Sequence, residues 1–196
     1  YWNFLASRML TQGVPMLLAG DKSGRTQRGN STACCQDNDI SWQDWNNTDQ
    51  DLLAFTHRLT SFCRTHPVFS RRGWFFGRDI LDPKNTDIAW FTIAGTQMEE
   101  QNWRDDFART LCLFLNGEVI PNPNPKGDHV TDKTFYLVFN AHSEDVTCKL
   151  PPNVWGEGWK KEMDTAVGWL TNEQIMPAEA EFPVTARSLV VLSRAT

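Results

Sequence analysis

The side chains in this sequence with the most chemical potential lie in one polar stretch, residues 22–47, and just before it. The stretch is rich in Gly, Asn, Asp, Ser and Thr, and loops of this length inside a compact domain usually carry function. Its carboxylate, guanidinium and amide groups can exchange hydrogen bonds with a polar ligand. The candidate binding residues are Asp21, Arg25, Asn30, Gln36, Asp37 and Asn38.

Each of these candidates also has a structural interpretation. Asp21 can form a turn or cap a helix as readily as it can orient a ligand-binding group. Arg25 can contact a ligand, although pairing with a carboxylate upstream of this chain is favoured for it. The polar side chains from residue 30 to residue 38 can instead hydrogen-bond within their own loop, so the sequence leaves the choice between ligand binding and loop structure open.

Aromatic and histidine side chains offer further chemistry, and a structural role is favoured for each of them. Trp42 and Trp45 could provide flat stacking surfaces, but their spacing of three residues beside a helix start favours core packing. His66 and His142 lack a companion residue at metal-ligand spacing. We therefore expect no metal site and no cofactor.

The polar stretch is positioned by an apolar run before it and a helix after it. Residues 14–18 are five apolar side chains in a row, which is typical of a central parallel strand buried on both faces, and barrel enzymes keep their chemistry just past the ends of such strands. One strand does not make a barrel, so we expect the others upstream of this chain. Helices are predicted over residues 2–12 and from Thr48, as the cap, to Pro67.

From Trp74 onward the hydrophobic period changes to two, which indicates β-structure. Turn-forming segments separate the predicted strands, and this spacing is typical of an antiparallel sandwich. The sequence thus predicts an α+β chain, with a strand and helices in residues 1–71 and an all-β sandwich in residues 72–196. The predicted strands are 87–92, 110–115, 135–140, 146–150, 159–164 and 188–192.

Composition excludes several classes of function. The formal net charge is -5 and the pI is near 5.3, which gives no basic field for nucleic acid. No apolar segment approaches the length of a membrane span. With 40% hydrophobic residues the chain can bury a core. The cysteines lack metal-ligand spacing and are expected to be reduced thiols in a cytoplasmic protein. They are Cys34, Cys35, Cys63, Cys112 and Cys148.

Several motifs in the chain resemble those of a known enzyme family. They are GVPMLLAGD at 13–21, GRTQ at 24–27, CQDNDISW at 35–42 and RTHPVF at 64–69, with further matches at 87–90, 102–103, 140–142 and 186–192. The chain resembles the bacterial glycogen debranching enzymes of the isoamylase type, within the α-amylase superfamily. One departure is Lys22, which stands where the superfamily usually has Glu directly after Gly-Asp.

The resemblance implies a C-terminal portion: the last strand, loop and helix of a (β/α)8 barrel in residues 1–71, followed by a β-sandwich domain. The family hydrolyses α-1,6-glucosidic branch points with retention, using two Asp and one Glu that would all lie upstream of Tyr1. No residue here is therefore expected to be catalytic, and the isolated chain is expected to be inactive.

The partners that the resemblance implies are an α-glucan, which the six candidate residues would bind, and the upstream part of the same barrel. Residues 1–71 could also pack on the sandwich through the second helix or associate with another copy. The alternative function is a non-catalytic accessory module that binds glucan or stabilises the enzyme. Scattered Trp residues in the predicted strands favour the stabilising role.

Overall fold

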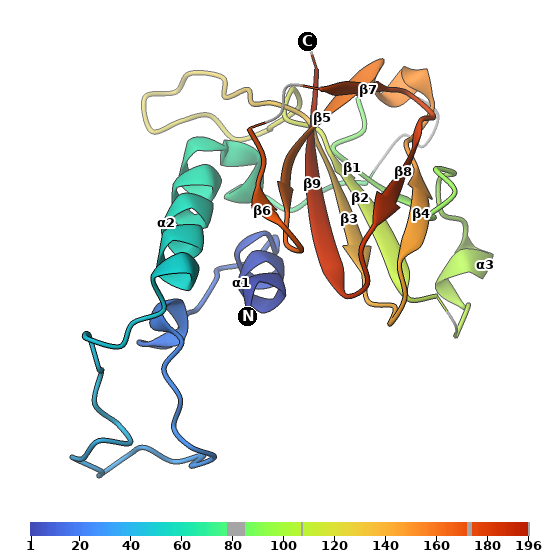
Figure 1. Ribbon diagram of the computed structural model, residues 1–196. Coiled ribbons are helices and arrows are strands. Elements are labelled where there is room, and N and C mark those ends of the chain that lie inside the picture. The colour runs from blue at the N-terminus through green and yellow to red at the C-terminus, as the bar shows by residue number, and fades with distance from the viewer. Residues whose placement is uncertain (78–84, 107, 172–173, 196) are drawn as a thin grey trace.

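The computed structural model describes residues 1–77, 85–106, 108–171 and 174–195. It contains two antiparallel sheets and two main helices that cover one face of the larger sheet (Figure 1). The helices are α1 (Trp2–Met9), α2 (Gln50–Thr65) and α3 (Glu100–Trp103), with 3-10 turns η1 (Asp21–Ser23), η2 (Pro67–Phe69) and η3 (Asn153–Trp155). The strands are β1 (Ile88–Phe91), β2 (Thr110–Leu115), β3 (Phe135–Asn140), β4 (Val146–Lys149), β5 (Gly158–Asp164), β6 (Gly168–Trp169), β7 (Ile175–Pro177), β8 (Glu181–Val184) and β9 (Ser188–Arg194).

The larger sheet has the strand order β1-β2-β3-β9-β5-β6, with β7 also paired to β5, and the smaller sheet pairs β4 with β8. Alternate side chains of the central strands enter two different cores, as strand geometry requires. Leu113, Leu137 and Val191 are in register and face the helices. Cys112 and Val138, one position away in register, belong to the core between the two sheets. The predicted antiparallel sandwich is therefore present.

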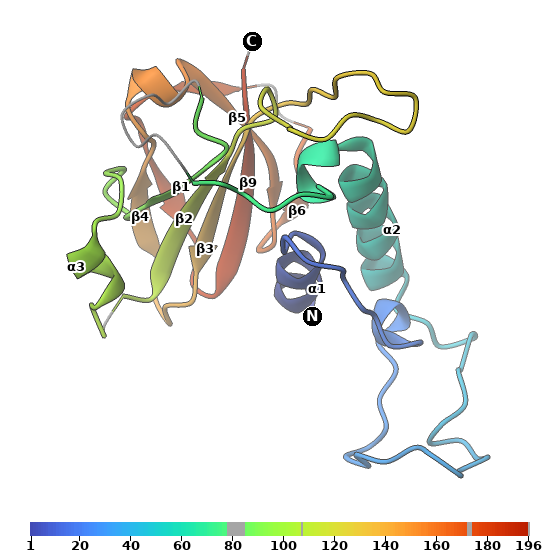
Figure 2. The ribbon, with the colours of Figure 1, turned by 180° about the vertical axis from the view of Figure 1, so that it is seen from behind.

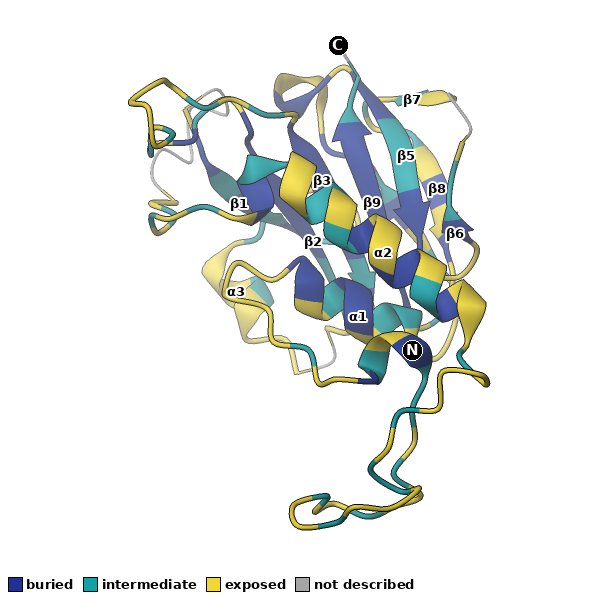
Figure 3. Ribbon diagram, turned by 90° about the vertical axis from the view of Figure 1, so that its left-hand side faces the viewer, coloured by how far each residue is buried: buried dark blue, intermediate teal, exposed yellow. Residues whose placement is uncertain are grey.

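Helices α1 and α2 pack on the open face of the large sheet, and Figure 3 shows a buried stripe of α2 turned toward it. Aromatic rings make this contact: Trp2 stacks on Phe55 at 4.6 Å between ring centroids, and Phe62 lies 5.5 Å from Phe135 of β3. The two predicted units thus share one core. The helix cap differs from the prediction, because Asp49 and not Thr48 accepts the hydrogen bond from the helix amides.

The connection after α2 is fixed by two buried carboxylates. Asp132 lies 2.7 Å from His66 Nδ1 and accepts a hydrogen bond from the backbone of Val68, which gives His66 a structural partner. Arg71 pairs with Asp87 at 3.1 Å, and their side chains are 1% and 7% exposed. These bonds tie the helical segment to the strands that follow it.

The apolar run at residues 14–18 differs from the expected buried strand. It pairs with no strand in the described part of the chain, and the exposed fractions of Val14, Met16 and Leu18 are 96%, 73% and 58%. The physical reason is that a central parallel strand needs neighbours on both edges and cover on both faces. The described residues pair no strand with this run, and of its side chains Leu17 packs against the core. The loop that follows the run extends away from the rest of the molecule (Figure 2).

Candidate functional site

The candidate residues lie on the loop that follows the apolar run at residues 14–18. This extended loop begins at a tight bend. Asp21 opens the turn η1, and its carboxylate accepts a hydrogen bond from the Leu18 amide at 3.0 Å. Gly20 has a positive φ of 102°, and a Cβ at this position would lie 2.7 Å from Arg25 Nε. Only glycine suits this conformation and this close approach. Asp21 therefore shapes the bend that directs the loop.

Arg25 points back across the base of the loop. Its Nη1 donates to the Ser41 carbonyl at 2.6 Å, which joins the outgoing and returning arms. Within the described residues no carboxylate lies within ion-pair distance of Arg25. The favoured pairing with a carboxylate outside this chain therefore stays a prediction. Next to it, the Gln43 amide donates to the buried Ser23 hydroxyl at 2.6 Å and holds the same base together.

The polar residues at the tip of the loop bond mainly to the loop itself. The Asn30 amide donates to Gln36 Oε1 at 2.9 Å, so these two candidates are brought together. Asp37 accepts from the Trp42 indole at 2.7 Å, and Asn38 accepts from the Ile40 amide at 3.0 Å. In the described part of the loop no side-chain hydrogen bond links Asp37 or Asn38 to the first pair.

A hollow of about 440 Å³ lies between the two arms of the loop. Arg28 and Asp39 form an exposed ion pair of 3.2 Å at its edge. A side-chain hydrogen bond from Asn47, followed by backbone amide bonds, holds the pKa of Asp44 below its ordinary value of 3.8. The lining is Ser23, Gly24, Arg25, Thr26, Arg28, Asp39, Trp42, Gln43, Asp44 and Asn47. The hollow thus offers charged and amide groups beside one indole.

The two tryptophans of the loop correct the prediction of core packing. Trp42 is 59% exposed and Trp45 is 64% exposed, because the loop stands clear of the body of the molecule. Lys22 is also exposed, and its Nζ lies 5.9 Å from the centre of the Trp45 ring. The sequence did not predict these exposed rings, because the three-residue spacing of the tryptophans does not show whether other parts of the protein pack against them.

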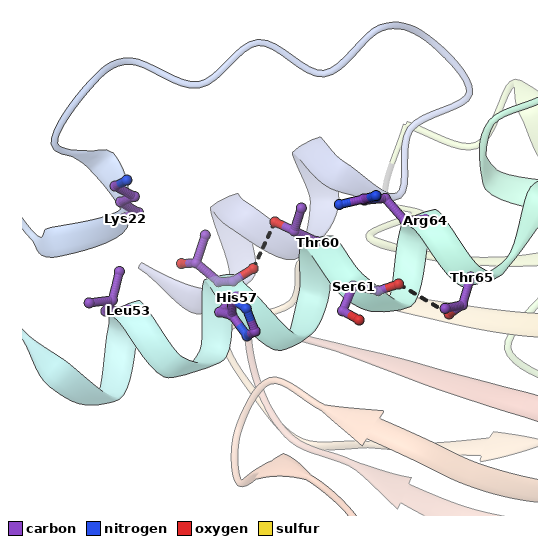
Figure 4. A pocket seen from close by; sticks show the side chains of 8 residues that line it. Lys22, Leu53, His57, Thr60, Ser61, Arg64 and Thr65 are labelled. Carbon is purple, nitrogen blue, oxygen red and sulfur yellow. Dashed lines mark hydrogen bonds between the residues drawn. The ribbon is translucent and has the colours of Figure 1, made fainter.

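A second hollow, of about 580 Å³, runs along the outer side of α2 (Figure 4). Lys22 stands at one end, and Arg64 lies toward the other end beneath the chain that arches over the helix. Thr60 and Thr65 direct their hydroxyls back to helix carbonyls, so these groups are already used. The hollow therefore offers fewer free hydroxyl groups to a ligand than the residue types in its lining indicate.

The described residues also bear on metal binding, membrane insertion and disulfide formation. No cluster of three or more His, Cys, Asp or Glu side chains there is arranged to hold a metal ion. Each helix in the part of the chain that the structure describes is too short or too polar to span a lipid bilayer. All five cysteines are free. The polar loop is thus the best-defined candidate for ligand contact.

Comparison with known proteins places this chain in a family. The family model described as "Isoamylase, C-terminal" matches residues 87–193, which is more than half of the chain. The chain is 40% identical over 195 residues to a glycogen operon protein GlgX homolog from Mycobacterium tuberculosis, covering 98% of this chain and 27% of that protein. It is 38% identical over 124 residues to a glycogen debranching enzyme from Cronobacter sakazakii, covering 63% and 18%.

Solved structures agree on the fold. A type I pullulanase from Bacillus subtilis, solved in complex with maltose, matches with a TM-score of 0.66 at 18% identity, over 100% of this chain and 23% of that one. This chain thus spans about a quarter of the length of the curated GlgX homolog and of the pullulanase that it matches. Its fold is that of an α+β portion of pullulanase-like enzymes, and the chain belongs to the isoamylase C-terminal family.

Proposed function

We propose that this chain is the C-terminal part of a cytoplasmic glycogen debranching enzyme that hydrolyses α-1,6-glucosidic branch points in glycogen or limit dextrins. The observation that carries the proposal is the family match, together with 40% identity to a glycogen operon protein across almost the whole chain. The catalytic carboxylates of such an enzyme would lie on polypeptide upstream of Tyr1. The chain by itself is then inactive.

In this proposal residues 14–18 are the last strand of a (β/α)8 barrel, and the barrel ends near residue 71. The exposed apolar run supports this assignment, because Val14, Met16 and Leu18 form the kind of surface that neighbouring strands cover. Burial of these three side chains would contribute several kcal/mol to docking, at about 25 cal/mol per Å² of apolar surface. The partner is therefore the upstream part of the same barrel.

The extended loop forms one rim of the substrate cleft in this proposal. Asp21 and Arg25 shape its base, while Asn30, Gln36, Asp37 and Asn38 offer acceptors and amide donors to glucose hydroxyls near its tip. Trp42 adds an exposed indole on which a sugar face can stack. The maltose in the Bacillus subtilis pullulanase structure is consistent with an α-glucan ligand for this fold.

The test compares this chain with a longer protein that includes its genomic upstream sequence. Release of reducing ends from glycogen is expected from the longer protein and not from residues 1–196. In the longer protein, Arg25→Ala is expected to lower kcat/KM by about 10-fold or more, because an arm of the loop loses its anchor. Glu100→Ala, an exposed change outside the loop, is the matched control. Activity of the isolated chain would overturn the assignment of the catalytic carboxylates.

The exposed apolar run at residues 14–18 predicts how the isolated chain behaves in solution. Self-association is expected to bury it, so the weight-average mass should rise with concentration in sedimentation equilibrium. Met16→Lys is expected to reduce this rise, whereas Val167→Lys, at another exposed apolar residue, is the control. A monodisperse monomer at every concentration would argue against an uncovered barrel edge.

A second candidate function is that the sandwich is an accessory module that stabilises the enzyme or binds glucan. Burial of Trp155 and Trp159 in the core between the sheets favours the stabilising role. Trp103 is 53% exposed but meets Trp90 edge-on at 5.5 Å and 78°, which presents no broad flat platform. Retention of the chain on a glycogen gel, lost in Trp103→Ala and kept in Trp74→Ala, would instead support glucan binding by the sandwich.

A further inference from the structure

Two cysteines from different sheets face each other in the core of the sandwich. Cys112 lies in β2 of the large sheet, and Cys148 lies in β4 of the small sheet. Their sulfur atoms are 3.9 Å apart, and both residues are 0% exposed. The two thiols are 36 positions apart in the sequence, so the fold and not the local chain brings them together.

The surroundings of the pair leave thiol chemistry as its main option. Phe114 and Val138 line the same apolar core, and the Tyr136 side chain interacts with Cys112. Within the described residues no His, Asp, Glu or further Cys joins the two sulfurs in a metal-binding group. A disulfide needs the sulfurs at about 2.05 Å, so the two sulfurs must approach each other by about 2 Å from their present separation. A cross-link between facing sheets is also a known way to join the two layers of a sandwich.

We infer that Cys112 and Cys148 form a redox-sensitive clasp that hydrogen peroxide closes into a disulfide between the two sheets. The oxidant is small and uncharged, so it can enter a core that opens transiently. The clasp would attach β4 covalently to β2 of the large sheet, and β8 would be held through its pairing with β4. It does not depend on the proposed debranching activity, because both cysteines lie within the sandwich.

The oxidation balances as two steps. Cys112 first gives up its proton, its thiolate attacks one oxygen of the peroxide, and the O–O bond breaks. The products are a sulfenic acid and a hydroxide, and the hydroxide takes up the proton from Cys112 to become one water. The Cys148 sulfur then attacks the sulfenic sulfur, the S–S bond forms, and the departing hydroxide takes the Cys148 proton as a second water. Two thiols and one peroxide thus give one disulfide and two waters.

The order of these steps follows from the hydrogen bond between the thiols. The hydrogen bond with Cys148 lowers the pKa of Cys112, with burial acting against it and a side-chain hydrogen bond with Tyr136 acting in the same direction. The same hydrogen bond and burial raise the pKa of Cys148. Cys112 is therefore the sulfur that attacks the peroxide, and Cys148 is the resolving thiol.

The experiment uses the full 196-residue chain with Cys34→Ser, Cys35→Ser and Cys63→Ala, which leaves only the pair. The folded protein is treated with hydrogen peroxide, then denatured, alkylated and weighed. The expected result is a mass loss of about 2 Da and no alkylation, reversed by dithiothreitol. The midpoint of thermal unfolding is expected to rise by about 10 °C, because the cross-link restricts the unfolded chain.

The matched control adds Cys148→Ala to the same background, and this variant should gain about 16 Da or more in place of losing 2 Da. Should the substituted chains fail to fold by circular dichroism, the unsubstituted chain is oxidised and digested with trypsin. The linked peptides would then be residues 110–126 and 134–149, each with one cysteine. Two alkylatable thiols after oxidation, or only sulfinic and sulfonic acids, would overturn the inference.

Discussion

Replacing Asp87 with alanine tests whether the buried ion pair fixes residues 71–77, which follow α2 and η2, against the start of β1. The Asp87 carboxylate accepts from Arg71 Nη2 at 3.1 Å and from the backbone amides of Phe76 and Gly77 at 2.9 and 3.0 Å. Arg71 in turn lies 3.8 Å over the Phe75 ring. The carboxylate thus holds both the guanidinium and the following turn in place.

The expected effect follows from what the substitution leaves behind. The Arg71 side chain is 1% exposed, and its Nε and Nη1 atoms already have no partner in the described structure. Without Asp87 the whole guanidinium becomes a buried, uncompensated charge, and breaking a buried pair in this way costs about 3–5 kcal/mol. For a chain of this size the midpoint of thermal unfolding should fall by about 10 °C.

The assay is urea and thermal unfolding followed by tryptophan fluorescence, with Glu100→Ala as the matched control. Glu100 pairs with Arg104 at the surface, with side chains 81% and 77% exposed, so its loss should change stability by less than about 1 kcal/mol. The double variant Arg71→Met with Asp87→Ala should be more stable than Asp87→Ala alone, because no charge remains buried. Equal effects of Asp87→Ala and Glu100→Ala, or a double variant less stable than Asp87→Ala, would refute the reasoning.

Three further predictions address local features. Asp49→Ala should lower the free energy of unfolding by about 1 kcal/mol in urea titrations, whereas Thr48→Ala should change it by less than about 0.5 kcal/mol, because Asp49 caps α2. Gly117→Ala should destabilise by about 1–3 kcal/mol, since its Cβ would lie 2.1 Å from a backbone oxygen, and Gly13→Ala, with nothing within 4 Å, should be neutral. The pKa of Asp44, measured by NMR, should lie below 3.8 because of its hydrogen bonds. The contribution of the Asp44 carboxylate to stability is complete above pH 3.8 and is lost as the pH falls through the pKa of the folded state. A measured pKa above 3.8 would contradict these hydrogen bonds.

Much of the sandwich could be predicted because its central strands carry strong local patterns. The predicted strands 110–115 and 135–140 match β2 and β3 residue for residue. The three short strands β6, β7 and β8 were missed, because two to four residues with Gly or Pro give no clear period of two. Their pairing depends on β5 and β4, which is a tertiary effect.

The N-terminal part shows where local pattern is insufficient. The sequence indicates a buried strand at residues 14–18 and core positions for Trp42 and Trp45. In this chain both tryptophans and the run are mostly exposed, with the exception of Leu17. An apolar pattern predicts that a segment is buried when all its neighbouring elements are present. The pattern does not show whether those elements belong to the same chain. The cap of α2 was displaced by one residue for a simpler reason: Thr48 and Asp49 are both good capping residues.

The hydrogen bonds within the loop predict that a glucan cannot bind the loop alone and needs a second protein surface that faces the loop. A glucan that binds the tip must replace bonds such as Asn30 to Gln36, and exchanging one hydrogen bond for another yields about 1 kcal/mol or less. Ordering the sugar and the loop costs more than that. Net affinity therefore requires a facing surface that desolvates the glucan and adds contacts without breaking the loop. In the proposed debranching enzyme, the upstream polypeptide that packs against the exposed run at residues 14–18 would supply this surface, so substrate binding and completion of the barrel would depend on one docking event.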